Sequence, residues 1–356
     1  MSRRVPLSLR EWGPGFGKKR RHILRPGVPE CYNIGDRGTS RSRSPTFGPG
    51  FKSAQVVQAL FPRTGASRMT GQPIEPVILQ EVGPRDGLQN ETVVLSVETR
   101  AEIIDLLADA GLPRIQIGSF VNPRLVPQMA ETDKVFRRLK NRKGVRHSVL
   151  ALNRRGLEAA LTAGLEHVEI FVSASETHSM KNSNMTMSEA LAQALDMIDL
   201  AISHGVGVTA GVMCALGCFY EGAVPVDRVV DIVSALEERG PTEICLADTA
   251  GMGRPQDVRA LLSAVLRNIP PERIALHLHD TYGFGLADLR VALEMGVRSF
   301  DTSVAGLGGC PFIPGAKGNI ATETVIETLE SMNFRTGVDL GKVRGVAVEL
   351  RRLLGR

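Results

Sequence analysis

The chain has 356 residues, 43% of them apolar, with 37 glycines and a formal net charge of +5. This length allows one large domain of about 250 residues plus accessory segments, and no apolar run approaches the roughly 20 residues that a membrane span needs. Three Tyr and one Trp give few aromatic surfaces for stacking nucleic-acid bases, and five scattered cysteines favour a reducing compartment over a disulfide scaffold.

The positive charge is concentrated in residues 1–70, which carry 14 Lys and Arg against 3 Asp and Glu. The other 286 residues carry 29 basic and 35 acidic side chains, so we expect no nucleic-acid partner for them. Residues 1–70 are rich in Arg, Gly, Pro and Ser without a hydrophobic period, which predicts a poorly ordered extension. Three interpretations stay open: a mitochondrial-type transit peptide, a basic tail for polyanions, or a start assigned too early, with Met69 as the true start.

From residue 76 onward, short apolar runs alternate with amphipathic helical patterns. Residues 96–110 show helical spacing with Ser96 as the predicted N-cap, Pro225 and Pro255 stand where first helical turns accept proline, and Gly111 and Gly164 stand where helices should end. The runs predicted as strands are 77–82, 114–119, 146–151, 167–173, 206–213, 243–247, 273–279 and 299–304.

Eight strands separated by helical segments predict an α/β fold, a (β/α)8 TIM barrel with a closed parallel sheet, over residues 76–335. The strands show little polar alternation, which is typical of strands covered by helices on their outer face. Residues 336–356 are predicted to form one more helix, packed on the outside of the barrel.

Polar residues follow several of these strands, at the end of a TIM barrel where active sites are built. His277 and His279 are two apart on a strand, so their imidazoles point to one face; they are either metal ligands or hydrogen-bonded core histidines. Asp86 follows the first strand and Asn319 follows the eighth. Together these four side chains suit Mg²⁺ or Mn²⁺ better than a structural Zn²⁺, which prefers thiolates.

Two further residues have both a structural and a functional interpretation. Arg85 beside Asp86 is either an ion pair of little consequence or a permanent charge for a developing enolate or carboxylate oxygen. Cys310 lies in a loop with three glycines and a proline, which is either a tight turn or a closing loop that carries a reactive thiol. Cys214 is interpreted as a core residue, and the role of Cys218 is left open.

Several strings of residues resemble one known family, the 3-hydroxy-3-methylglutaryl-CoA lyases, over about residues 77–340. The Arg-Asp-Gly element at 85–87 is shared with a wider superfamily of synthases and carboxyltransferases, whereas the Leu-Gln-Asn after it and the Gly-Gly-Cys-Pro loop resemble the lyases specifically. The matching segments are 81–91, 119–121, 126–129, 214–218, 277–283 and 306–311.

The resemblance implies retro-Claisen cleavage of an acyl-CoA to acetyl-CoA and acetoacetate, a reaction of leucine degradation and ketone-body formation. It implies that Asp86, His277, His279 and Asn319 hold the divalent metal. Arg85 would stabilise the enolate, Cys310 would help to deliver a proton, and Asp248 matches a polar active-site position. Ser119, Gly308 and Gly309 match substrate-binding positions. The resemblance also implies a homodimer. The cysteine usage and the lack of a membrane-spanning run predict a cytoplasmic protein, or a protein of the mitochondrial matrix if residues 1–70 are a transit peptide.

One position departs from the family, because Gln116 stands where a catalytic glutamate is usual. Glutamine keeps the shape and hydrogen bonding of glutamate but loses its charge and acid–base capacity, which typically contributes about 10²–10⁴-fold in rate. Either the metal and Arg85 dominate catalysis, or the substrate is a related 3-hydroxyacyl-CoA, or the protein is a weakly active metal- and CoA-binding paralogue. A Claisen-type synthase that condenses an acyl-CoA with a 2-oxo acid is the other alternative.

Overall fold

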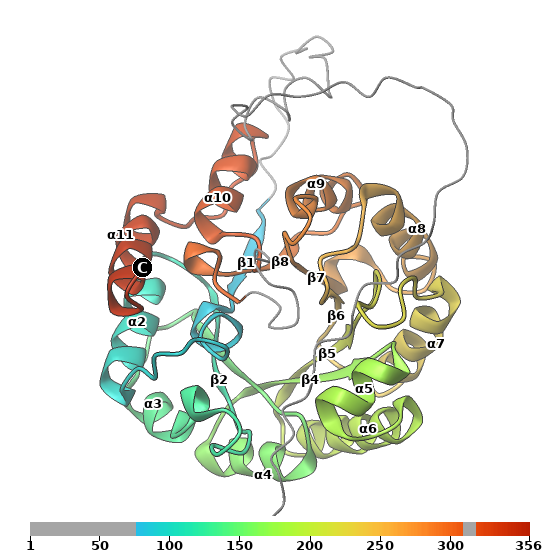
Figure 1. Cartoon of the computed structure of the whole chain (residues 1–356), viewed down its shortest axis with the longest axis horizontal. Coiled ribbons are helices and arrows are strands. Elements are labelled where there is room, and N and C mark those ends of the chain that lie inside the picture. The colour runs from blue at the N-terminus through green and yellow to red at the C-terminus, as the bar shows by residue number, and fades with distance from the viewer. Residues whose placement is uncertain (1–75, 309–317) are drawn as a thin grey trace, which may run out of the picture. The chain divides into compact units, whose positions relative to one another are not determined.

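The computed structural model describes residues 76–308 and 318–356. The expectations for residues 1–70 with Met69, and those for Gly309 and Cys310, lie outside these described residues. Eight parallel strands close into a barrel in chain order, with β8 hydrogen-bonded back to β1, and helices form a ring around them (Figure 1). The TIM-barrel prediction is therefore confirmed.

Each predicted strand coincides with an observed one to within two residues at either end. The strands are β1 (Ile78–Glu81), β2 (Arg114–Ser119), β3 (Arg146–Leu150), β4 (His167–Ser173), β5 (Gly207–Met213), β6 (Glu243–Asp248), β7 (Ile274–Leu278) and β8 (Ser299–Thr302). The helices are α2 (Val97–Asp109), α3 (Thr132–Arg138), α4 (Arg154–Ala163), α5 (Glu176–Ser183), α6 (Met187–Ser203), α7 (Val226–Glu237), α8 (Pro255–Val265), α9 (Gly285–Glu294), α10 (Thr322–Ser331) and α11 (Leu340–Leu353).

Helix boundaries follow the local signals in the sequence. The Ser96 hydroxyl accepts a hydrogen bond from the Thr99 N–H at 3.2 Å and caps α2 as predicted. Gly164 ends α4 with a φ of 86°, a left-handed conformation that glycine adopts without strain. Pro255 is the first residue of α8, whereas Pro225 is the N-cap of α7 and so stands one residue before the helix.

The interior of the barrel contains a layer of polar side chains just below its carboxyl-terminal end. Glu169 of β4 accepts hydrogen bonds from Gln80, Gln116 and Ser148 of the three preceding strands, and Gln80 also donates to Asp301 of β8. Apolar residues that alternate with this layer along the strands join the hydrophobic core beneath the helices. The polar layer therefore supports whatever is built at the strand ends above it.

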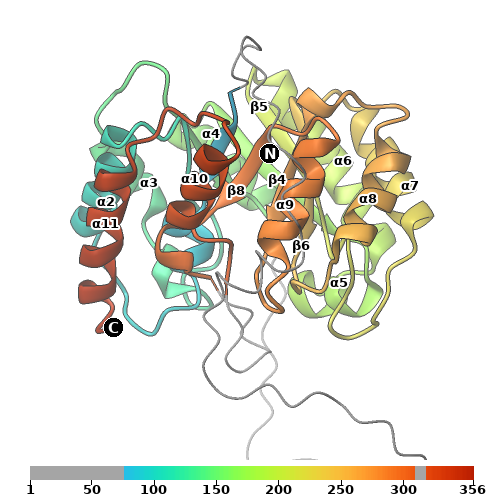
Figure 2. The same ribbon diagram turned by 90° about the horizontal axis from the view of Figure 1, so that it is seen from above.

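The C-terminal helix α11 packs against α2 and α10 on the outside of the barrel (Figure 1). In the view from above, α8 and α9 lie side by side next to the strands (Figure 2). Among the described residues, no helix is both long enough and apolar enough to cross a membrane.

Candidate active site

The turn after β1 places the first two site residues. Gly83–Gly87 forms one π-helical turn, η1, in which the Gly87 N–H donates to the Val82 carbonyl at 3.2 Å and the Leu88 N–H to the Gly83 carbonyl at 3.0 Å; such wide turns are frequent at functional sites. The Glu81 carboxylate accepts the N–H groups of Gly83 and Val304, each at 2.8 Å, and so fixes η1 to the loop after β8. A Cβ at Gly83 would lie 2.6 Å from Glu81 Oε1, so the turn needs glycine here.

Asp86, His277 and His279 converge at the carboxyl-terminal end of the barrel. Asp86 Oδ2 lies 3.6 Å from His279 Nε2 and 4.0 Å from His277 Nε2, and the two Nε2 atoms are 3.1 Å apart. All three side chains are buried, and each contributes one potential ligand atom, these atoms all lying within 4.8 Å of one another. Atoms this close either share a proton or surround a cation.

Asn319 completes the set predicted from the sequence. Its segment joins the end of β7, where the Ile320 N–H donates to the Leu278 carbonyl at 3.1 Å, and its Nδ2 donates to Asp86 Oδ2 at 2.7 Å. Asn319 Oδ1 is buried and has no hydrogen-bond partner among the described residues. An unpartnered buried oxygen beside one carboxylate and two imidazoles fits a hard divalent cation.

Electrostatics hold Asp86 ready to bind a cation. Burial raises the pKa of Asp86, but the Arg85 guanidinium and the two imidazoles outweigh it and keep this pKa well below its ordinary range. Burial lowers the pKa of His277, but the hydrogen bond to Asp301 and the charges of Asp301 and Asp86 outweigh it and raise this pKa. His277 Nδ1 lies 3.0 Å from Asp301 Oδ2, the carboxylate–histidine arrangement that orients metal-binding imidazoles.

Arg85 lies between the Asp86–His277–His279 cluster and the polar layer below it. Its Nη1 donates to Asp86 Oδ1 at 2.7 Å, and its Nε donates to the side-chain oxygen of Gln116. Gln116 itself has no exposed surface and is not among the residues that line the cavity above. Gln116 therefore contacts Arg85 from beneath, so any catalytic effect of this residue passes through Arg85.

A cavity of about 730 Å³ opens above these residues, within the size range of small-molecule sites. Of the residues predicted from the sequence, the cavity is lined by Arg85, Asp86, Ser119, His277, His279 and Gly308. At Gly308 a Cβ would lie 2.5 Å from Asn319 Nδ2 and 3.0 Å from the Asp86 carbonyl. The absence of a side chain at Gly308 lets the backbone approach Asp86 and Asn319 closely.

Asp248 has a different environment from the other predicted site residues. It lies at the end of β6, buried, where it accepts the N–H groups of Met252 at 3.1 Å and Gly253 at 2.9 Å. It is absent from the residues that line the cavity. These contacts hold the loop after β6 in place, and a direct catalytic role for Asp248 stays a prediction.

Several residues at the site are absent from the sequence prediction. His178 follows β4, lines the cavity and has its pKa lowered by burial; a polar residue just after a strand is the signal that could have found it. Glu169 and Asp301 are acids inside the strands β4 and β8, and an acid within a predicted buried strand is a second usable signal. Cys214 is buried as predicted but also lines the cavity, and the Cys218 thiol donates to Ser175 Oγ at 3.0 Å.

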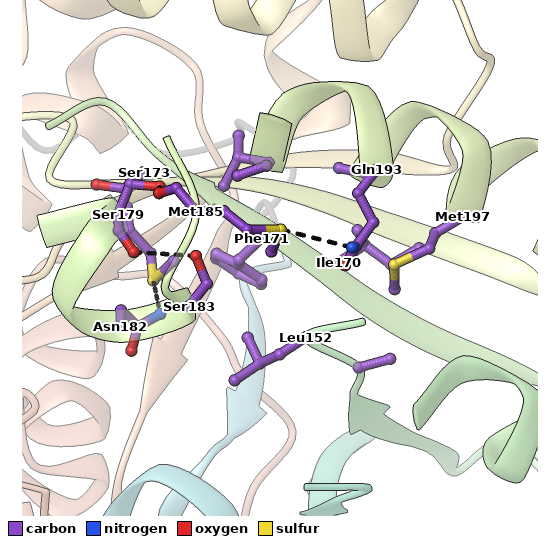
Figure 3. Close-up of a pocket in the computed structure, with 15 residues that line it drawn as sticks. Leu152, Ile170, Phe171, Ser173, Ser179, Asn182, Ser183, Met185, Gln193 and Met197 are labelled. Carbon is purple, nitrogen blue, oxygen red and sulfur yellow. Dashed lines mark hydrogen bonds between the residues drawn. The ribbon is translucent and has the colours of Figure 1, made fainter. Parts of the chain in front are cut away.

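A smaller cavity of about 20 Å³ adjoins the main one. Phe171, Met185, Gln193 and Met213 line both cavities, and Gln193 Nε2 donates to the Met185 sulfur at 3.5 Å (Figure 3). Methionine side chains adapt easily to irregular space. The small cavity is thus an extension of the site, lined by both apolar and polar side chains and bordered by methionines that can adapt.

Comparisons with known proteins agree with this geometry. The HMGL-like family model matches residues 76–349. The chain belongs to the HMGL-like family. It is 44% identical to hydroxymethylglutaryl-CoA lyase of Pseudomonas mevalonii, over 79% of this chain and 94% of that one. It is 43% identical to the cytoplasmic 3-hydroxy-3-methylglutaryl-CoA lyase of Rattus norvegicus, over 81% of this chain and 84% of that one. The crystal structure of the Bacillus subtilis HMG-CoA lyase superposes with a TM-score of 0.78 at 40% identity, covering 80% of this chain and 96% of that one.

Proposed function

We propose that this chain catalyses metal-dependent retro-Claisen cleavage of 3-hydroxy-3-methylglutaryl-CoA, or a close 3-hydroxyacyl-CoA, to acetyl-CoA and a 3-oxo acid, acetoacetate for the parent substrate. The convergence of Asp86, His277 and His279 beside Arg85, on the wall of a cavity of about 730 Å³, carries the proposal. The HMGL-like family and the names of the relatives above support this carbon–carbon lyase assignment over a Claisen-type synthase.

Asp86, His277, His279 and the unpartnered Oδ1 of Asn319 would hold the divalent cation, which we propose to be Mg²⁺ or Mn²⁺ because two of the four donors are hard oxygens. When bound, the cation supplies Lewis acidity that lowers the pKa of the substrate hydroxyl. Asp301 keeps the His277 ring oriented, with Nε2 toward the cluster.

Arg85 would stabilise the thioester enolate that forms when the carbon–carbon bond breaks. Its charge is permanent, and two of its nitrogens are already held by Asp86 and Gln116, so it needs no reorganisation as the enolate forms. Over the whole reaction the hydroxyl proton of the substrate is balanced by the proton that completes the methyl group of acetyl-CoA. Cys310 would help to return that proton, and Ser119, Gly308 and Gly309 would bind substrate.

The deciding experiment measures acetyl-CoA release from 3-hydroxy-3-methylglutaryl-CoA and several branched analogues with added Mg²⁺ or Mn²⁺. We expect release that stops on chelation and returns when the metal is restored. Absence of metal-dependent release with every substrate would refute the lyase proposal. The homodimer and the cytoplasmic or mitochondrial location stay predictions; relatives include proteins named for either compartment.

A further inference from the structure

A buried carboxyl group on β4 lies directly below the candidate active site and is not one of the proposed metal ligands. Glu169 has no exposed surface and its side chain points into the barrel. Its Oε1 accepts hydrogen bonds from Ser148 Oγ at 2.6 Å and Gln80 Nε2 at 3.2 Å, and its Oε2 accepts one from Gln116 Nε2. An ionisable side chain so enclosed needs hydrogen-bond partners of this kind.

The amide of Gln116 connects this carboxylate to Arg85. Its oxygen accepts from Arg85 Nε, while its nitrogen donates to Glu169. The reverse orientation of the amide would place its N–H groups against the guanidinium and its oxygen against the carboxylate, so only one orientation satisfies both neighbours. Arg85, Gln116 and Glu169 therefore form a line with a positive charge at the upper end and a carboxyl at the lower end.

We propose that Glu169 is a positioning residue of the cleavage reaction, which holds the Arg85 guanidinium in place through the Gln116 amide. This inference rests on the proposed lyase function. It gives the absence of a glutamate at position 116 a physical reason, because the carboxylate that supports Arg85 stands one layer deeper, on β4 instead of β2. Gln116 is then the residue that this arrangement requires and not a loss of function.

The electrostatic surroundings of Glu169 disfavour a second carboxylate beside it. Burial and the charge of Asp301 raise the pKa of Glu169 to about 7, while the Ser148 hydrogen bond and the charges of Arg85 and Arg146 oppose the shift. A glutamate at position 116 would face Glu169 across a hydrogen-bond distance, and two such acids hold one proton between them. Adding the acid at position 116 should therefore disturb the line unless Glu169 is changed as well.

A charge-exchange series tests the proposal with four proteins: the wild type, Gln116→Glu, Glu169→Gln, and the double variant that carries both changes. Steady-state kcat and KM for metal-dependent acetyl-CoA release are measured at an alkaline pH, where both acids are driven to ionise. We expect each single variant to lose about 10–100-fold in kcat with little change in KM, because a displaced Arg85 weakens only the transition state. The double variant again contains one carboxylate and one amide, and we expect its kcat within a few-fold of wild type.

The control is Glu243→Gln, which removes a buried acid of β6 whose ion-pair partners are Arg114 at 2.8 Å and Arg146 at 3.9 Å, away from Arg85. We expect lower thermal stability but an unchanged kcat from this variant. The proposal is overturned by a wild-type kcat in Glu169→Gln, by a gain of activity in Gln116→Glu alone, or by a double variant as poor as the product of the single losses.

Unfolding of the same four proteins in denaturant provides a readout that does not depend on catalysis. We expect a coupling free energy between positions 116 and 169, visible as non-additive changes in stability. Additive changes would mean that the two side chains do not interact. That result would overturn the positioning role of Glu169 but not the proposed lyase function. An inactive wild type would overturn the proposed function, and the positioning role with it, even if the coupling were found.

Discussion

The two ends of the barrel interior both contain buried charges, but they use them differently. At the amino-terminal end, Glu243 is paired with Arg114 at 2.8 Å and Arg146 at 3.9 Å, so the acid lies between two partners of opposite charge. At the carboxyl-terminal end, Asp86 meets two imidazoles beside a cavity, and Asn319 Oδ1 has no partner among the described residues. Paired charge supports the fold, whereas charge with an unfilled acceptor beside it indicates a ligand site.

Among the variants, Asp86→Asn should cause the largest loss of activity. A small loss would contradict the distinction between a structural end and a ligand-binding end of the barrel interior. We expect kcat/KM to fall by about three orders of magnitude, since a metal Lewis acid contributes several kcal/mol to the transition state. Isothermal titration with Mn²⁺ should show weaker binding in parallel. Near-normal activity and metal affinity in this variant would mean that the cluster is a hydrogen-bonded core and not a metal site.

Asp301→Asn tests whether the polar layer supports the proposed metal site, formed by Asp86, His277 and His279, from below. The substitution weakens the carboxylate that orients His277 through Nδ1, and we expect metal affinity to fall by about 10–100-fold. Titration with Mn²⁺ measures this loss directly. An unchanged affinity would show that the His277 ring is held by packing alone.

Metal affinity should also depend on pH, with a sign fixed by His277. The pKa of His277 is raised in the absence of metal. As the pH falls through that pKa, the ring gains a proton, and the protonated nitrogen can no longer coordinate a metal ion. Asp86 stays ionised, because its pKa lies well below the ordinary range. We expect Mn²⁺ affinity to fall by up to about tenfold per pH unit below the His277 pKa. An affinity that does not change on mild acidification would contradict this.

Met213→Ala should produce a smaller and more selective change. Met213 borders both the main cavity and the small cavity beside it, and its truncation enlarges the space there. We expect kcat/KM for a substrate with a longer branch at C3 to rise by roughly tenfold relative to the methyl substrate, the range of one or two methylene groups in an apolar pocket. Equal effects on both substrates would place the branch elsewhere in the cavity.

Glu243→Gln should leave the site untouched and reduce stability. Removing one partner of a largely buried pair leaves the Arg114 charge unpaired, and we expect a loss of about 1–3 kcal/mol in the free energy of unfolding, measured in denaturant. Metal affinity and kcat should stay at wild-type values. A large fall in kcat would show that the two ends of the interior are coupled and that the contrast between them is too simple.

The sequence by itself determined the barrel and much of its rim. The alternation of strands and helices is a local pattern, and each strand is bounded by turn residues that act within a few positions, so all eight strands were predicted within two residues. The side-chain period of a strand also puts His277 and His279 on one face. Because TIM barrels place their sites at the carboxyl-terminal ends of strands, Asp86 could be assigned to the same region.

Only the tertiary structure decided which interior side chains meet. Glu169 and Gln116 are 53 residues apart and His277 and Asp301 are 24 apart, and local periodicity says that a side chain points inward but not which neighbour it reaches. Strand stagger and side-chain rotamers, set by closure of the whole barrel, fix those pairs. Closure of the barrel therefore places the Glu169 carboxyl group below Gln116 and directs Asp248 toward its own loop. It also leaves the Asn319 Oδ1 atom without a hydrogen bond among the described residues, where it could bind a cation.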